Sequence, residues 1–160
     1  MDNITIYFNG EKLQCLIGAI VSVILIAASV YFQFLQKPML KGIAYSVIPL
    51  STLLIIICVG VIFRTPKDIK RVTKFQIETP QKIQTEEIPR MEKVMKSFNI
   101  IKNVELVLLA IGLVILVVFW KNEQLRGIGI GIIIMSISLY TFDHIAEARG
   151  ENYIRFLKSL

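Results

Sequence analysis

The chain has 160 residues, of which 54% are hydrophobic, and a mean hydropathy of +0.64. Soluble globular domains are roughly 45 to 50% apolar, so this composition argues against one and indicates a single membrane domain. The net charge of +6 does not indicate nucleic-acid binding, because the basic residues lie beside apolar runs without a recognition motif or aromatic stacking residues. The anionic headgroups of a lipid bilayer are the simpler partner for this charge.

Motifs for catalysis or cofactor binding are not found in the sequence. Cys15 and Cys58 lie inside apolar runs and lack the spacing of a disulfide framework or zinc knuckle. The chain has no Walker loop, no His-Glu-x-x-His and no Gly-x-Ser-x-Gly. We therefore predict no catalytic residue and no cofactor.

The first pair of predicted elements consists of two membrane spans, at 13–35 and 42–63. Each is long enough for the ~20 residues that cross a hydrocarbon core. The residues before the first span lack the positive n-region of a secretory signal, so this span is expected to stay in the membrane. The short loop between the spans, which contains Pro38, predicts an antiparallel pair. Pro49 is expected to bend the second span.

A polar linker is predicted after the second span. Arg64-Thr65-Pro66 is expected to end that span, and the residues up to Gln84 mix charge with Thr, Gln and Pro. We expect an irregular linker that faces lipid headgroups. Within it, 73–78 alternates apolar and polar residues, which predicts a short strand or an extended piece.

An amphipathic helix is predicted next, completing the central segment 64–103. From Pro89 onward, apolar residues recur at intervals of three and four, which is the helical pattern. The helix is expected to begin at Thr85 or Ile88. Because no helix breaker precedes the third span, at 104–120, helix and span are expected to form one rod of about thirty residues.

The fourth span is predicted at 127–142, and 143–160 keeps an amphipathic pattern that should continue the helix. The predicted fold is therefore an all-α integral membrane protein with four transmembrane helices in two antiparallel hairpins. Helices 3 and 4 are expected to extend into the cytoplasm as a helical hairpin.

The distribution of Lys and Arg predicts the orientation. If the central segment is cytoplasmic, fourteen of the eighteen basic residues lie inside, against Lys37, Lys41, Lys121 and Arg126 outside. Cytoplasmic loops of membrane proteins carry such an excess. We expect a bacterial inner-membrane protein with both termini in the cytoplasm.

The cytoplasmic parts of helices 3 and 4 are expected to lie side by side. This arrangement predicts charge pairs between Lys96 and Glu151 and between Glu92 and Arg155, which set register more than stability. The predicted interaction surface for a protein partner comprises Arg90, Lys93, Lys96, Glu151 and Arg155.

One group of side chains has residue types that bind metals. Asp143, His144 and Glu147 lie on one helical edge at the end of the fourth span, and another helix could add ligands. Cys15, Cys58 and Glu105 are expected at a similar depth. The sequence favours a different interpretation, because lipid excludes polar residues toward helix ends. In that interpretation the carboxylates are satisfied by Arg64, Lys102 and Arg149.

Small residues predict where helices approach closely. Gly127 and Gly131 form a GxxxG pair, and Gly18 with Ser22 forms a small-xxx-small counterpart in the first span. We expect these contacts within one chain rather than between copies, although a homo-oligomer stays open.

The expected function is binding. No ionisable residue lies in the middle of a span, which disfavours a coupled transporter. We expect a small polytopic inner-membrane protein that acts by protein-protein interaction through its cytoplasmic helices, as an accessory, effector or immunity-type protein. One alternative is a homo-oligomeric pore or small-solute channel, and another is a membrane enzyme or metal-binding protein centred on His144. The hydroxyl groups that would line the pore are those of Ser46, Ser51, Ser136, Ser138 and Thr141.

Overall fold

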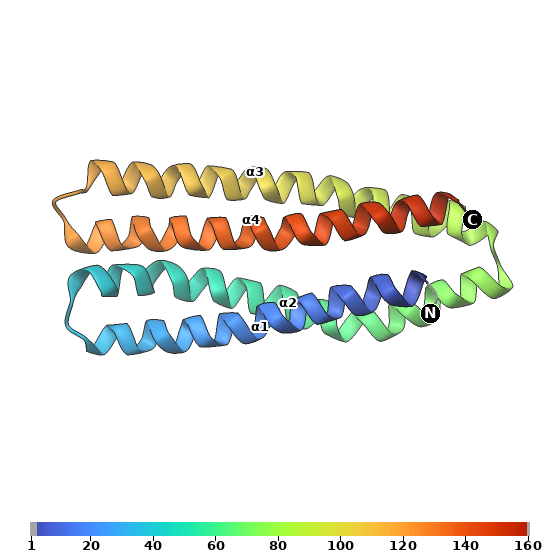
Figure 1. The fold of residues 1–160 in the computed structure, drawn as a ribbon, viewed down its shortest axis with the longest axis horizontal. Coiled ribbons are helices and arrows are strands. Elements are labelled where there is room, and N and C mark those ends of the chain that lie inside the picture. The colour runs from blue at the N-terminus through green and yellow to red at the C-terminus, as the bar shows by residue number, and fades with distance from the viewer. Residues whose placement is uncertain (1–2, 160) are drawn as a thin grey trace.

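A computed structural model describes residues 3–159, which are almost entirely helical and contain no strand (Figure 1). The four long helices are each long and apolar enough to cross a membrane. Leu160, the last residue of the predicted C-terminal helix, lies outside the described residues, as do Met1 and Asp2. The elements are α1 (Asn3–Phe34), α2 (Pro38–Glu78), the π-helical turn η1 (Ile83–Glu87), α3 (Ile88–Val118) and α4 (Glu123–Lys158).

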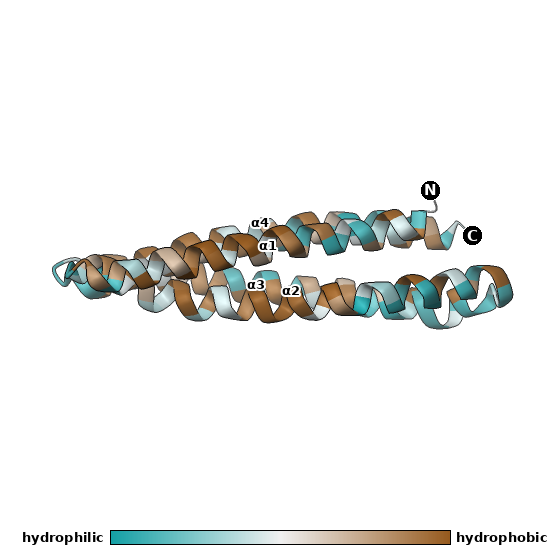
Figure 2. Cartoon of the chain, turned by 90° about the horizontal axis from the view of Figure 1, so that it is seen from below, coloured by the Kyte–Doolittle hydropathy of each residue, from teal (hydrophilic) through white to brown (hydrophobic). Residues whose placement is uncertain are grey.

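The middle parts of the helices expose more apolar side-chain surface than soluble proteins do. Only 11% of the most apolar 18-residue window of α3 is buried within the protein, and only 28% of the window of α4. Figure 2 shows these apolar stretches in brown, with the polar residues gathered toward the end that carries both termini. Because soluble monomers rarely expose large contiguous apolar surfaces, lipid is the solvent that suits this surface.

The helices pack in a fixed order. α1 lies beside α2, α3 lies beside α4, and α4 also packs against α2 (Figure 1). Tight connections join each neighbouring pair at the end opposite the termini. In the first, Gln36 adopts a left-handed backbone conformation with φ of 53°. In the second, the side chain of Asn122 caps α4 by accepting hydrogen bonds from the backbone N–H groups of Gln124 and Leu125.

Helix α2 continues past the point where the sequence predicts its end. Arg64-Thr65-Pro66 does not stop the helix, which runs for 41 residues to Glu78 with Pro66 inside it. The predicted irregular linker and the predicted strand at 73–78 are therefore wrong. Val72 and Phe75 are buried by other helices, and this tertiary packing outweighs the local cost of a proline, which removes one backbone hydrogen bond.

The other helix extensions agree with the pattern of the sequence. The rod predicted for the third helix is confirmed, because α3 runs without interruption from Ile88, with Pro89 in its first turn, to Val118. Helix α4 likewise continues past the fourth predicted span to Lys158. Helix α1 begins at Asn3, about three turns before the first predicted span.

All four helices therefore extend beyond the apolar stretches at the same end. We call this polar end the head. It comprises 3–12 of α1, 64–78 of α2, η1 with 88–102 of α3, and 143–158 of α4.

Candidate functional site

The head has a hydrophobic core of its own. The core joins every helix of the head, and its buried members are Ile4, Tyr7, Phe8, Val72, Phe75, Ile83, Ile88, Met91, Tyr153 and Leu157. At its centre the rings of Tyr7 and Tyr153 stack with centroids 4.1 Å apart and planes 3° from parallel. Burial raises the pKa of both phenols above the ordinary tyrosine value. Both side chains therefore stay neutral and act as packing residues.

A buried carboxylate lies at the edge of this core. Glu87 is 1% exposed and accepts hydrogen bonds from Arg90 Nη2 at 2.6 Å and Nε at 2.9 Å. Arg71 Nη2 lies 3.3 Å from the same carboxylate, and Tyr153 OH donates to it over 3.4 Å. Burial lowers the pKa of Arg90, but the hydrogen bonds to Glu87 outweigh this effect and raise it. The network ties α2, η1, α3 and α4 together through charge-assisted bonds.

The side chains predicted as candidate metal ligands, Asp143, His144 and Glu147, contact other side chains instead. Both oxygens of Glu147 accept hydrogen bonds from Lys102 Nζ, at 2.6 and 2.7 Å. His144 is largely exposed, with Nδ1 3.7 Å from Glu147 Oε2. Asp143 lies beside Glu105 of α3. Within residues 3–159, no three His, Cys, Asp or Glu side chains are grouped so as to hold a metal ion.

The cations at this level differ in what they contact. Lys102 pairs with Glu147, and the hydrogen bond to that carboxylate raises the pKa of Lys102. Arg64 binds Glu11 of α1 at 3.1 Å and Asp68 of its own helix at 3.6 Å. Of the three cations expected to satisfy the carboxylates of this cluster, Lys102 binds Glu147, whereas Arg64 binds Glu11 and Asp68 outside the cluster. Arg149 does not appear in any ion pair of the described residues, and its Nη1 atom is buried without a hydrogen-bond partner.

The two cysteines meet at the inner end of the head. Cys15 of α1 and Cys58 of α2 are buried, free and adjacent to each other. The sequence placed them at a similar depth to Glu105, but they lie between α1 and α2, whereas Glu105 is on α3, beside Asp143 of α4. Cys58 nevertheless lies within electrostatic range of Asp143, and in the described part of the chain no three of these side chains are grouped so as to hold a metal ion.

The predicted interaction surface divides into exposed and internal residues. Lys93 and Lys96 are exposed on α3 and are absent from the ion pairs formed by described residues. Glu151 and Arg155 are exposed on α4 and pair with each other at 3.6 Å. Arg90 is the exception, because its guanidinium turns inward to Glu87.

The predicted charge pairs between α3 and α4 are wrong. Glu92 pairs with Lys158, at 2.9 Å, rather than with Arg155. Glu151 pairs with Arg155 rather than with Lys96. The two helices are antiparallel neighbours, but Glu92 meets Lys158, three residues further along α4 than the expected partner Arg155. A register based on aligning the membrane boundaries misses this offset because the boundaries carry no side-chain contact information.

The small residues singled out in the sequence face other helices of the same chain. A Cβ on Gly127 would collide with the carbonyl oxygen of Met39 on α2, and a Cβ on Gly131 would collide with Ser46 Oγ. Gly18 faces Phe142 of α4 and Cys58 of α2, and Ser22 is fully buried. These small residues allow the helix backbones to approach each other closely.

Comparison with models of protein families, with curated proteins and with solved structures gives no match. Function is therefore inferred from the geometry of the chain.

The sequence reasoning missed the buried network of the head. Glu87 stands near the predicted start of a helix, where an acidic side chain is ordinarily exposed, and the first predicted span begins only at residue 13. One available signal was the spacing of Ile4, Tyr7 and Phe8, which lie three and four residues apart and continue the register of the first span. The partners of Glu87 are distant in sequence, and no local pattern identifies them.

Proposed function

We propose that this chain is a bacterial inner-membrane protein whose head lies in the cytoplasm and binds a protein partner. Its four helices anchor the head and its role is that of an accessory, effector or immunity-type protein. The observation that carries the proposal is the separate core of the head. This core forms where all four helices continue well beyond their apolar stretches. A protein that needed only to span the bilayer would not require this structure.

The distribution of charge supports the orientation. Lys37, Lys41, Lys121 and Arg126 lie near the two tight connections, and the remaining fourteen basic residues lie at or near the head. Because Lys and Arg accumulate on the cytoplasmic side, this distribution supports a head inside the cell, with residues 3–12 and 143–158 on the same side. The two antiparallel hairpins then cross the membrane with α3 and α4 extending into the cytoplasm.

The surface of the head supports an acidic partner. Most acidic side chains of the head are engaged by cations of the same chain, as Glu87, Glu92 and Glu147 illustrate. Lys93 and Lys96 stay exposed, one turn apart on α3. The surface therefore offers positive charge to an incoming molecule, and complementary charge gives both specificity and a fast association rate.

The pore alternative has less support. Thr141 and Ser138 donate to carbonyl oxygens of their own helix, as does Ser46. Ser51 and Ser136 are buried, and Ser51 lies against Met135 of α4. The buried Ser51 and Ser136 suit helix packing, in which small residues allow close approach. The metal alternative has less support because, among residues 3–159, His144 is not grouped with two further side chains that could bind a metal ion.

Site-specific photo-crosslinking in living cells tests the proposal. A photoreactive residue at position 96 should give one discrete adduct with another protein, and the same residue at position 121, at the other end of the molecule, should not. Lys93→Glu should abolish the adduct because it reverses the charge beside the probe, whereas Lys12→Glu on α1 should leave it. Adducts only with further copies of this chain would reject a separate partner in favour of a homo-oligomer.

A further inference from the structure

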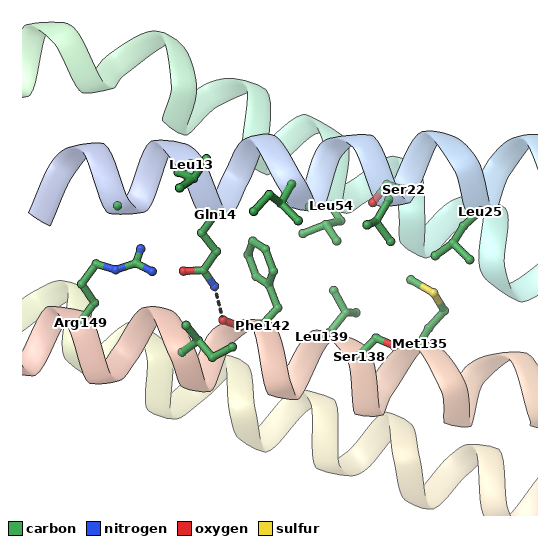
Figure 3. Close-up of a pocket in the computed structure, with 15 residues that line it drawn as sticks. Leu13, Gln14, Ser22, Leu25, Leu54, Met135, Ser138, Leu139, Phe142 and Arg149 are labelled. Atoms are coloured by element: carbon green, nitrogen blue, oxygen red, sulfur yellow. Dashed lines mark hydrogen bonds between the residues drawn. The ribbon is translucent and has the colours of Figure 1, made fainter. Parts of the chain in front are cut away.

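A long groove lies between α1 and α4, at the place where these two helices separate below the head (Figure 3). Its volume is about 450 Å³. Leu25 of α1 faces Met135 and Leu139 of α4 across it, and Leu13, Val21 and Phe142 also line it. The lining is almost wholly apolar, and Gln14, Ser22, Ser138 and Arg149 are the polar side chains that reach it.

The dimensions of the groove match one leaflet of a bilayer. From Leu13 to Leu25 a helix rises ~18 Å, and half of a hydrocarbon core is ~15 Å. The groove begins at the head end of the first predicted span and ends near the middle of that span. An acyl chain of the leaflet on the side of the head would therefore fit along it.

A cation lies at the head end of the groove. The guanidinium of Arg149 points between the two helices in Figure 3, and its Nη1 atom is buried with no hydrogen-bond partner in the described part of the chain. A Cβ on Gly10 would lie 3.0 Å from Arg149 Nε, so the absence of a side chain there makes room for the guanidinium. A buried charged donor without a partner is costly, so this atom favours an anion.

A second polar atom beside Arg149 also lacks a partner. Gln14 Nε2 donates to the carbonyl oxygen of Phe142 at 2.6 Å, which fixes the amide and directs its Oε1 atom the other way. Gln14 Oε1 is buried and accepts no hydrogen bond from the described residues. The end of the groove thus presents one free cationic donor and one free acceptor.

A smaller cavity of about 310 Å³ continues beyond Arg149 into the head. Asn3 and Asn152 contribute amide groups to it, and Arg149 belongs to the lining of both cavities. Neither lining contains a carboxylate among the described residues. An apolar slot, a cation and a polar space therefore follow one another along the same line.

We propose that this site binds an anionic phospholipid from the leaflet on the side of the head. One acyl chain occupies the groove, the phosphate accepts hydrogen bonds from Arg149, and a headgroup hydroxyl donates to Gln14 Oε1. Arg149 favours an anionic headgroup over a zwitterionic one. Both present a phosphate to the guanidinium, but the zwitterion also brings a quaternary ammonium near this cation and has no headgroup hydroxyl to donate to Gln14 Oε1. A second copy of the chain is a weaker candidate occupant than a phospholipid, because it would have to bring a carboxylate to Arg149.

Native mass spectrometry of the full chain in neutral detergent tests this site. Phosphatidylglycerol and phosphatidylcholine with the same acyl chains serve as probes. The unchanged protein should retain phosphatidylglycerol about tenfold more strongly, and Arg149→Gln should remove this preference. Arg155→Gln, which removes an exposed arginine from the same helix, should keep it. Equal losses in both variants would show general charge attraction and overturn the proposal.

A second variant tests the groove independently of charge. Ser138→Phe fills the groove and should lower retention of phosphatidylglycerol severalfold, whereas Ile137→Phe adds bulk at an exposed neighbouring position outside the lining and should not. This pair decides the matter if Arg149→Gln does not fold, as judged by circular dichroism. Unchanged lipid retention in a folded Ser138→Phe protein would overturn the proposal.

Discussion

The ring of Tyr7 stacks on the ring of Tyr153, with 4.1 Å between centroids. This contact joins the first turns of α1 to the last turns of α4, and Phe8 meets Tyr153 edge-on at 5.7 Å. The same two helices border the groove below. The stack therefore closes the head at one end of the groove and sets how far α1 and α4 can separate there.

The buried carboxylate of Glu87 is expected to hold the head together. Glu87→Ala leaves Arg90 and Arg71 without their shared partner, and we expect it to lower the free energy of unfolding by about 2 to 4 kcal/mol. Glu86→Ala is the matched control and should cost less than about 1 kcal/mol, because Glu86 is exposed and its ion pair among the described residues is with Lys82. Denaturant unfolding in mixed micelles measures both. Equal effects would mean that the network contributes nothing beyond an exposed pair.

Gly127 is expected to set the distance between α2 and α4. Gly127→Ala places a methyl group against the backbone of Met39, and such overpacking should destabilise the protein by about 1 to 3 kcal/mol. Gly60→Ala is the control, because a Cβ at Gly60 meets nothing within 4 Å. That change should be neutral or stabilise by up to about 1 kcal/mol through helix propensity. Thermal unfolding in detergent compares them, and a stable Gly127→Ala protein would argue against close packing here.

Lys102 and Glu147 are expected to be energetically coupled across α3 and α4. Their side chains are 20% and 10% exposed, against 67% and 60% for the pair Lys74–Glu78. A double-mutant cycle to Ala should give a coupling above about 1 kcal/mol for the first pair and about 0.3 to 0.5 kcal/mol for the second. The same value in both cycles would contradict this expectation.

The pH dependence of this coupling follows from the lysine. The hydrogen bond to Glu147 raises the pKa of Lys102 above its ordinary value of 10.5. The stabilisation is therefore fully present below pH 10.5 and is lost as the pH rises through the raised pKa of the folded state. Unfolding measured between pH 8 and 12 should show this loss in the unchanged protein but not in Lys102→Ala.

The four apolar helices were predictable from the sequence because lipid selects for long uninterrupted apolar runs. The continuity of α3 was also predictable, since no helix breaker lies between Pro89 and Val118. These features depend on residues that are close together in the chain.

The extension of α2 and the network of the head were not predictable in this way. Pro66 has the local character of a helix terminator, and contacts with distant parts of the chain, such as those of Val72 and Phe75, stabilise the helix beyond it. Glu87 resembles any acidic residue near a helix start until Arg71 and Tyr153 are brought to it from other helices. The register of α3 against α4 depends in the same way on side-chain packing across the interface.

The position of the head is tested most directly by labelling single cysteines with a membrane-impermeant maleimide. Lys93→Cys reports on the head and Lys121→Cys on the opposite end, in a protein whose Cys15 and Cys58 are replaced by Ala. We predict that intact cells label position 121 but not position 93, and that position 93 reacts once the inner membrane is broken. Labelling of position 93 in intact cells, with position 121 protected, would place the head outside and contradict its proposed role in binding a cytoplasmic partner.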